Sequence, residues 1–148
     1  MNYKIKFHTK WSDFDANKHM RHTAYNDFAA EARLRFLKEN GFGVDAMEKH
    51  QLGPILFSEN TIFKREIKLG EDIYVELLLE AASKNGERFK IMHHIYKEDG
   101  TLSATISVYL AWIDMVKRKL TSPPKAFLQT LSNINKTIDF EEIILKTK

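Results

Sequence analysis

The feature that most limits the fold of this 148-residue chain is one amphipathic helix followed by a long run of strands. Apolar residues recur at helical spacing and form a single stripe: Tyr25, Phe28, Ala29, Ala32 and Phe36. This spacing predicts a helix of about four to five turns. Thr23 is its expected N-cap, and Gly41 suits its C-terminal stop.

Residues 55–119 then alternate apolar and polar side chains, which is the period of β-strands. Asn85-Gly86 and Asp99-Gly100 predict hairpin turns, because Asn, Asp and Gly tolerate positive φ. Two successive hairpins place three antiparallel strands side by side. One helix with several strands is an α+β arrangement, in which the helix covers only one face of the sheet. Because the other face or an edge must find burial elsewhere, we expect a homo-oligomer.

The flanking segments are less regular. A strand is expected over residues 3–12, a loop over 13–21 and a short helix over 125–136. No repeat or low-complexity linker divides the chain. We therefore expect one domain over residues 1–131 and a C-terminal extension over 132–148, within which positions 138–145 suit either a strand or a helix.

Composition excludes several classes of function. The chain has no cysteine, which excludes disulfides, thiolate metal sites and cysteine nucleophiles. The net charge of +3 is too small for a nucleic-acid-binding surface, although it permits an anionic partner. The sequence has no signal-peptide apolar region and no run of about 18 apolar residues. We therefore expect a cytoplasmic protein without a membrane span.

The segment from Asp13 to Tyr25 concentrates carboxylates, histidines and a tyrosine just before the helix. A helix N-terminus offers unpaired backbone N–H groups and partial positive charge, which favour an oxyanion. A nearby Asp can attack a carbonyl or activate water, and a His can hold or shuttle a proton. These groups suit hydrolysis of an activated acyl compound, although Asp-x-Asp before a helix is also common turn chemistry.

Other chemistries fit this sequence less well. Four side chains of the segment are capable metal ligands: Asp13, Asp15, His19 and His22. No recognised ligand motif completes the set, so we expect no metal site and no cofactor. A G-x-S-x-G elbow and a phosphate-binding Gly loop are absent, which disfavours serine hydrolases and nucleotide triphosphatases. His93 lies on the apolar side of its strand and is interpreted as a core histidine.

At this segment the sequence resembles the 4-hydroxybenzoyl-CoA thioesterase family of hotdog-fold proteins. The family pattern D-x-D-x-x-(G)-x-x-x-(H/N)-x-x-Y corresponds here to Asp13, Asp15, His22 and Tyr25. The resemblance extends over about residues 3–131, including an aromatic-basic stretch at 63–72. It implies a hotdog fold, in which an antiparallel β-sheet wraps a long central helix and the molecules dimerise edge to edge.

The resemblance also implies hydrolysis of an acyl-CoA thioester by a homodimer or homotetramer. Asp15 matches the family's catalytic Asp, which is proposed as nucleophile or general base. His22 matches the histidine of the subgroup associated with the Tol–Pal envelope system, at a position whose backbone N–H points to the thioester carbonyl. Tyr25 matches an aromatic residue of the same helix, and Trp11 and His19 are further expected substrate contacts.

The phosphates of CoA need cationic side chains to bind them, and Lys64 and Arg65 are candidates. The alternative interpretation is that these two residues are solvated surface charges. The chain departs from the family at Lys18, where glycine is usual, and at Trp11, where the Tol–Pal subgroup has tyrosine. These departures leave a non-catalytic acyl-CoA-binding protein as one alternative. A second alternative is an acyl-carrier-protein thioesterase, because a basic surface around the site would suit an acidic carrier protein as well as CoA. Glu31, on the helix, is either a catalytic carboxylate or a structurally paired one.

Overall fold

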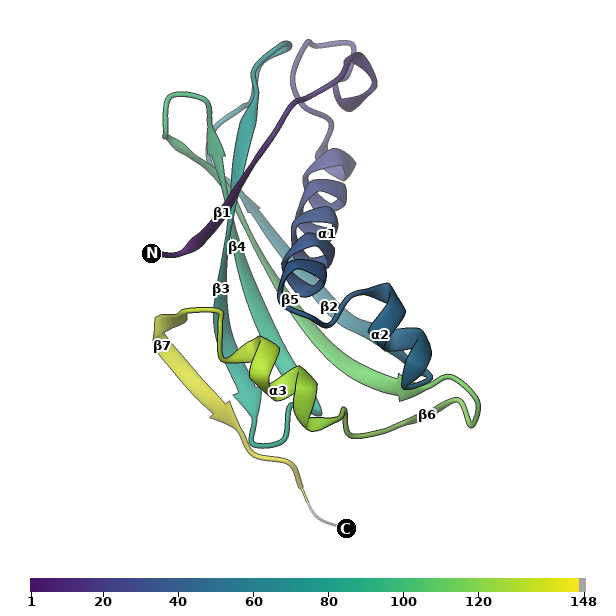
Figure 1. Ribbon diagram of the computed structural model, residues 1–148. Coiled ribbons are helices and arrows are strands. Elements are labelled where there is room, and N and C mark those ends of the chain that lie inside the picture. Colours follow the sequence, from purple (N-terminus) through teal and green to yellow (C-terminus); the bar gives the residue numbers. More distant parts are fainter. Residues whose placement is uncertain (147–148) are drawn as a thin grey trace.

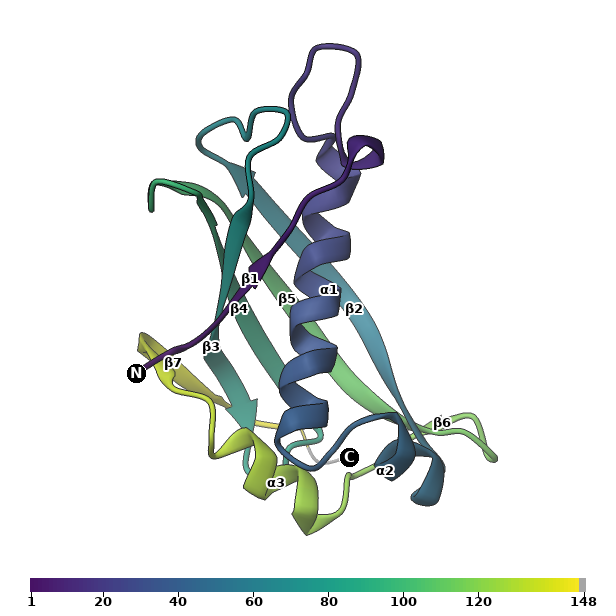
Figure 2. The ribbon, with the colours of Figure 1, turned by 45° about the horizontal axis from the view of Figure 1, so that its top comes forward.

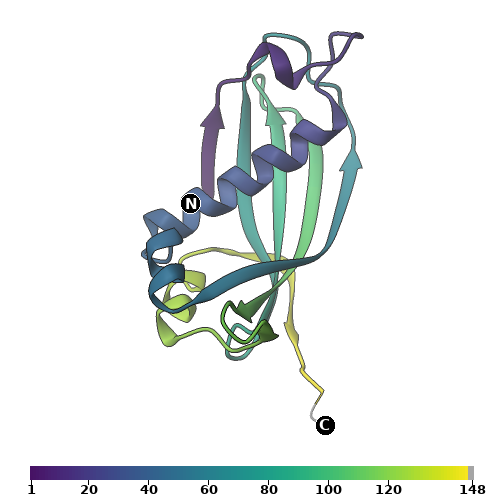
Figure 3. The same cartoon turned by 90° about the vertical axis from the view of Figure 1, so that its right-hand side faces the viewer.

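The computed structural model describes residues 1–146, in which a curved antiparallel sheet wraps one long helix (Figure 1). The elements in chain order are β1 (Tyr3–Phe7), the 3-10 helix η1 (Trp11–Asp13), α1 (His22–Glu39), α2 (Val44–Lys49), β2 (Leu52–Phe63), β3 (Ile73–Ser83), β4 (Arg88–Lys97), β5 (Leu102–Asp114), β6 (Lys119–Leu120), α3 (Lys125–Leu131) and β7 (Lys136–Ile143). The helix α1 crosses the sheet diagonally (Figure 2 and Figure 3). This confirms the predicted α+β arrangement. Within residues 1–146, no helix combines the length and hydrophobicity that a transmembrane span needs.

The sheet has the strand order β1-β3-β4-β5-β2, with antiparallel pairing between each of these neighbours. Burial alternates strictly along β3, as the period of two predicts. The inward-facing side chains of β3 to β5 pack against α1 and form the core with it. The strand β2 ends this order and pairs only with β5 among the described strands, which leaves its outer edge open.

The helix α1 buries the predicted stripe, with Phe28 only partly covered. The small residues Ala29 and Ala32 let the helix approach the sheet closely. Gly41 follows the helix with φ of +86°, as expected of a C-terminal stop. The predicted cap at Thr23 is wrong: the N-cap is Arg21, and the Thr23 hydroxyl accepts a hydrogen bond from the Arg21 guanidinium instead of from the backbone.

Both predicted hairpins are present. Gly86 and Gly100 adopt φ of +75° and +89°, a left-handed conformation that glycine reaches without steric cost. The turns span residues 84–87 and 98–101, and are therefore longer than the two-residue turns that the sequence predicts. In the second turn the Asp99 carboxylate accepts the Thr101 N–H at 2.9 Å, which stabilises the longer loop.

The first strand is shorter than predicted. It ends at Phe7, because the Asp72 carboxylate binds the His8 ring and the Thr9 N–H and draws the chain away from the sheet. The next segment forms η1 instead of continuing the strand, with Asp13 accepting the Lys10 N–H at 2.9 Å. The expected strand over residues 3–12 is thus corrected to residues 3–7.

The C-terminal segment closes one end of the sheet. The helix α3 stops at Leu131 instead of 136, and its Phe127 ring packs edge-to-face on Trp112 at 4.7 Å. β7 then pairs in parallel with β3. Of the two alternatives for positions 138–145, strand and helix, positions 138–143 therefore form a strand. The boundary between residues 1–131 and 132–148 stays a prediction, and positions 147–148 lie outside the described residues.

A polar pair lies inside the apolar core between α1 and β4. His93 is fully buried, and its Nδ1–H donates to the Ile106 carbonyl at 2.8 Å. Arg33 donates from Nη1 to Nε2 of the same ring at 3.2 Å. Because arginine can only donate, Nε2 must be the acceptor. Burial, together with the Arg33 charge, lowers the pKa of His93 to about 3. The predicted core histidine is therefore confirmed, and it is neutral.

Candidate functional site

A cavity of about 410 Å³ lies at the N-terminal end of α1. Three segments meet there: the loop after η1, the first turn of α1 and the end of β2 with the residues after it. The lining residues are Asp15, His19, Met20, His22, Tyr25, Phe63, Lys64, Arg65 and Glu66. In Figure 1 this is the end of α1 where the loop that follows β1 enters the helix.

Asp15 begins a tight turn that presents its carboxylate to the cavity. Its Oδ1 accepts the Asn17 N–H at 2.9 Å and the His19 N–H at 3.3 Å, while the Asp15 N–H donates to the His19 carbonyl at 2.9 Å. Lys18 closes the turn with φ of +63°, so lysine adopts the conformation for which glycine is usual. Among the described residues Oδ2 of Asp15 has no partner. One carboxylate oxygen is thus available for chemistry.

Asp13 has a different environment from Asp15. Its side chain is 3% exposed, and it accepts the Lys10 N–H at 2.9 Å and the Lys10 ammonium at 3.1 Å. Its carbonyl also accepts the Arg21 N–H at 2.9 Å. Asp13 therefore fixes the loop, and Asp15 is the carboxylate of the pair that reaches the cavity.

His22 is the first residue of α1, directly after the N-cap Arg21. In the part of the chain that the structure describes, the backbone N–H groups of His22 and Thr23 have no acceptor. The Arg21 guanidinium is held against the loop by the Ser12 carbonyl at 2.8 Å. The cavity thus contains a carboxylate beside a helix N-terminus, whose unpaired N–H groups and dipole stabilise negative charge.

Aromatic rings form the apolar wall. Tyr25 is buried and meets Phe63 edge-to-face, with ring centroids 5.0 Å apart. Phe63 itself is half exposed at the end of β2. Such a wall suits an acyl group better than a charged ligand.

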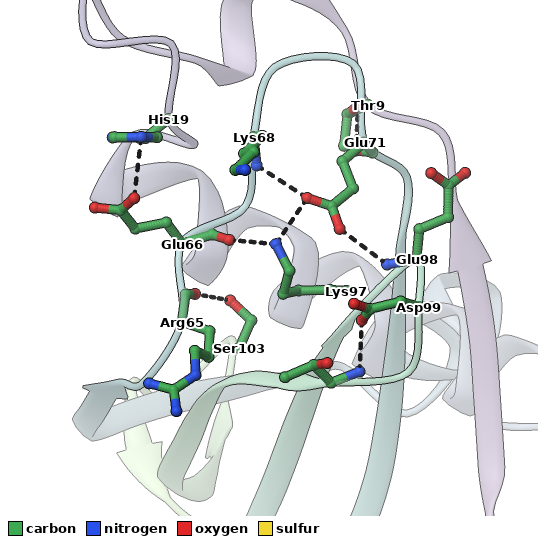
Figure 4. Close-up of polar contacts among 11 residues, drawn as sticks. Thr9, His19, Arg65, Glu66, Lys68, Glu71, Lys97, Glu98, Asp99 and Ser103 are labelled. Carbon is green, nitrogen blue, oxygen red and sulfur yellow. Dashed lines mark hydrogen bonds and ion pairs between the residues drawn. The ribbon is translucent and has the colours of Figure 1, made fainter.

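Lys64 and Arg65 supply positive charge at the rim, and a buried serine fixes their backbone. The Ser103 carbonyl accepts both N–H groups, from Lys64 at 2.7 Å and from Arg65 at 3.0 Å. The Ser103 hydroxyl donates to the Arg65 carbonyl at 2.6 Å (Figure 4). Both cationic side chains are exposed, so they are free to meet an anionic ligand.

His19 faces the same rim, where its Nε2 lies 3.0 Å from the Glu66 carboxylate (Figure 4). All predicted site residues except Trp11 are therefore brought together at the cavity. The Trp11 side chain is 81% exposed on η1 and does not line it, because the helical turn directs the indole to solvent.

Sequence reasoning missed Met20, Phe63, Glu66 and Ser103 as parts of the site. Phe63 and Glu66 fall in the aromatic-basic stretch that the resemblance covers, and Met20 falls in the segment from Asp13 to Tyr25, whereas Ser103 has no such signal. Glu31, by contrast, lies outside the cavity: it is half exposed and pairs with Arg35 at 2.9 Å. Within residues 1–146, no three His, Asp or Glu side chains gather as metal ligands.

Comparison with known proteins identifies the family. Residues 9–131 match the thioesterase-like superfamily. The chain belongs to this superfamily. The sequence resemblance implies a thioester hydrolase, and membership of this superfamily confirms that enzyme class. Among curated proteins, no sequence matches the chain.

Solved structures of similar architecture confirm the hotdog fold. A hypothetical protein from Staphylococcus aureus, solved in complex with CoA, superposes with a TM-score of 0.84 at 23% identity, covering 93% of this chain and 88% of the other. A 1,4-dihydroxy-2-naphthoyl-CoA thioesterase from Synechocystis gives 0.79 at 15% identity, covering 90% and 97%. A gentisyl-coenzyme A thioesterase gives 0.76 at 19% identity, covering 87% and 99%.

Proposed function

We propose that this thioesterase-superfamily protein is a cytoplasmic acyl-CoA thioesterase, related to the 4-hydroxybenzoyl-CoA thioesterase family. It would hydrolyse an acyl-CoA to the free acid and CoA. The observation that carries the proposal is that Asp15, with one free carboxylate oxygen, and His22, with an unpaired backbone N–H group, line the same cavity. A protein of similar architecture from Staphylococcus aureus was solved in complex with CoA, which supports CoA as the carrier.

The chemistry follows from these groups. Asp15 accepts a proton from water while the water oxygen bonds to the thioester carbonyl carbon. The N–H groups at the start of α1, with that of His22 foremost, stabilise the resulting oxyanion. The C–S bond then breaks, the carbonyl reforms, and the CoA sulfur takes the proton from Asp15, which restores the carboxylate. In the second form of the mechanism Asp15 attacks the carbonyl carbon itself, and the C–S bond breaks to release the CoA thiolate. Water then hydrolyses the mixed anhydride, which releases the free acid, restores the Asp15 carboxylate and supplies the proton of the CoA thiol.

Substrate binding is assigned to the remaining residues of the cavity. The acyl group would contact Tyr25, while His19, Lys64 and Arg65 would meet the polar part of CoA at the rim. The exposed Trp11 is assigned to a portion of substrate outside the cavity, because it lies on the loop that leads to Asp15. Lys and Arg side chains form strong charge-assisted hydrogen bonds with phosphate oxygens.

A panel of acyl-CoA thioesters, assayed by thiol release, tests the proposal. The panel should span short, long and aromatic acyl groups, and the best acyl group should also be offered on acyl carrier protein. We expect turnover of at least one acyl-CoA and a lower kcat/KM on the carrier protein. A preference for the carrier protein would favour the first alternative, and tight acyl-CoA binding without turnover would favour a binding protein and contradict the proposal.

We further propose that two copies associate along the open edge of β2. That strand exposes large apolar side chains, which water solvates poorly: Leu56, Phe57, Ile62 and Phe63. Light scattering should give a mass of two or four 17.3 kDa chains. Ile62→Lys should raise the dissociation constant at least ~10-fold, whereas Ile138→Lys, on the distant β7, should not. A single-chain mass for the wild-type protein would contradict this assembly.

A further inference from the structure

A partly buried ion pair joins the β2–β3 loop to the end of β4. The Lys97 ammonium lies 2.9 Å from Oε2 of Glu71, and the two side chains are only 14% and 15% exposed. The same ammonium donates to the Glu66 carbonyl at 2.5 Å (Figure 4). Lys97 thus binds the loop at two points, Glu66 and Glu71, and ties its start to its end.

The Glu71 carboxylate makes two further contacts that hold the loop against the end of β4. It accepts the Lys68 N–H at 3.0 Å and the Glu98 N–H at 3.3 Å, so it contacts both the loop and the residue after β4. The Lys97 hydrogen bond and charge also contribute to a lowered pKa of Glu71, which keeps the carboxylate ionised. Loss of the ammonium would leave a partly buried carboxylate without its cation and would remove the bond to the Glu66 carbonyl, so the loop would lose the contact that joins its two ends.

The part of the loop between these anchors holds the turn that contains Asp15. The Met20 N–H donates to the Ile67 carbonyl at 2.8 Å, and the Leu69 N–H donates to the Lys18 carbonyl at 2.9 Å. His19 adds its 3.0 Å contact with Glu66. Each of these contacts with the Asp15 turn comes from a residue between Glu66 and Glu71.

We propose that Lys97 is a positioning residue for Asp15, acting through the β2–β3 loop. The inference rests on the proposed thioesterase function for its kinetic consequence. Lys97 does not line the cavity, and it lies 82 residues after Asp15 in the sequence (97 − 15). Its effect is geometric: a shift of about 1 Å in a reacting group can lower a rate by up to ~100-fold.

Lys97→Met tests this role, because methionine keeps much of the length of lysine and removes its charge. We expect kcat to fall about tenfold with KM changed less than about threefold, since CoA contacts are left in place. Hydrogen exchange should become faster in the peptide covering residues 14–21. Lys97→Arg, which restores a donor and a charge, should recover most of kcat. Lys90→Met, on the same strand but over the Tyr109 ring, is the matched control and should behave as wild type.

The two measurements separate the failure of this inference from the failure of the proposed function. Exchange in residues 14–21 needs no substrate, so it decides the positioning role even if no acyl-CoA is turned over. If Lys97→Met does not fold, the double variant Glu71→Gln/Lys97→Met, which removes both charges of the ion pair, replaces it in the test. Wild-type exchange in residues 14–21 and wild-type kcat in a folded variant would overturn the proposal.

Discussion

Replacing Asp15 with asparagine should lower kcat for thioester hydrolysis by about 100-fold or more, the range expected when a positioned acid–base group is lost. The amide oxygen of asparagine can still accept the N–H groups of Asn17 and His19, so the turn should persist. What disappears is the second carboxylate oxygen, which would bind the proton of water or attack the carbonyl. Thiol release at saturating acyl-CoA measures the loss, and calorimetry should show little change in CoA affinity.

Asp27→Asn is the matched control for this variant. Asp27 also lies near the start of α1, but its side chain is 76% exposed and it does not line the cavity. We expect its kcat to stay within about twofold of wild type. An Asp15→Asn protein with full activity would show that the carboxylate is not required, whatever the activity of the control.

Acidification should lower the free energy of unfolding, because His93 is buried and neutral in the folded protein. Between pH 7 and pH 5 the free energy of unfolding should fall by about 2 kcal/mol more in the wild-type protein than in His93→Gln. In the unfolded chain the imidazole protonates near its ordinary pKa of 6.5, whereas in the folded protein burial and Arg33 lower that pKa to about 3. The unfolded state therefore binds more protons below pH 6.5. The stability is present above that pH and is lost progressively toward pH 3.

The interval from pH 7 to pH 5 is chosen to separate His93 from the carboxylates. Folding lowers the pKa values of Glu71 and Glu76, so their contributions are lost only at lower pH. Urea unfolding followed by circular dichroism gives the free energy at each pH. His94→Gln, on the opposite face of the same strand, retains His93 and should retain the wild-type slope. Equal slopes for wild type and His93→Gln would contradict a neutral buried ring.

Local patterns in the sequence predicted the parts of this fold that local physics decides. Alternation over residues 73–112 specified which side chains of β3 to β5 face α1, because a one-residue slip would turn the apolar set to solvent. Gly86 and Gly100 marked the turns because their φ angles are positive. The loop from Asp15 to His22 was found as a site because it places a carboxylate next to a helix N-terminus in sequence as well as in space.

Features that depend on contacts distant in sequence could not be predicted in this way. The end of β1 at Phe7 depends on Asp72, which is far from it in sequence. The contacts of Asp13 and Asp15 are local, but the sequence pattern does not specify which N–H groups each carboxylate accepts. Trp11 lies outside the cavity, because η1 directs its side chain to solvent, and the sequence has no signal for this orientation. The contact of Lys97 with Glu66 and Glu71 has no sequence signal at all, since an isolated lysine at the end of a strand is usually a surface charge.

The most direct test of thioester hydrolysis at this cavity is the rate of thiol release from the best acyl-CoA, measured for wild type and Asp15→Asn in the same buffer. We predict a saturable wild-type rate about 10⁶-fold or more above spontaneous hydrolysis, at the lower end of enzymatic acceleration. Asp15→Asn should remove most of that acceleration while it still binds CoA. A wild-type rate equal to the spontaneous rate for every acyl-CoA of the panel would contradict the central claim.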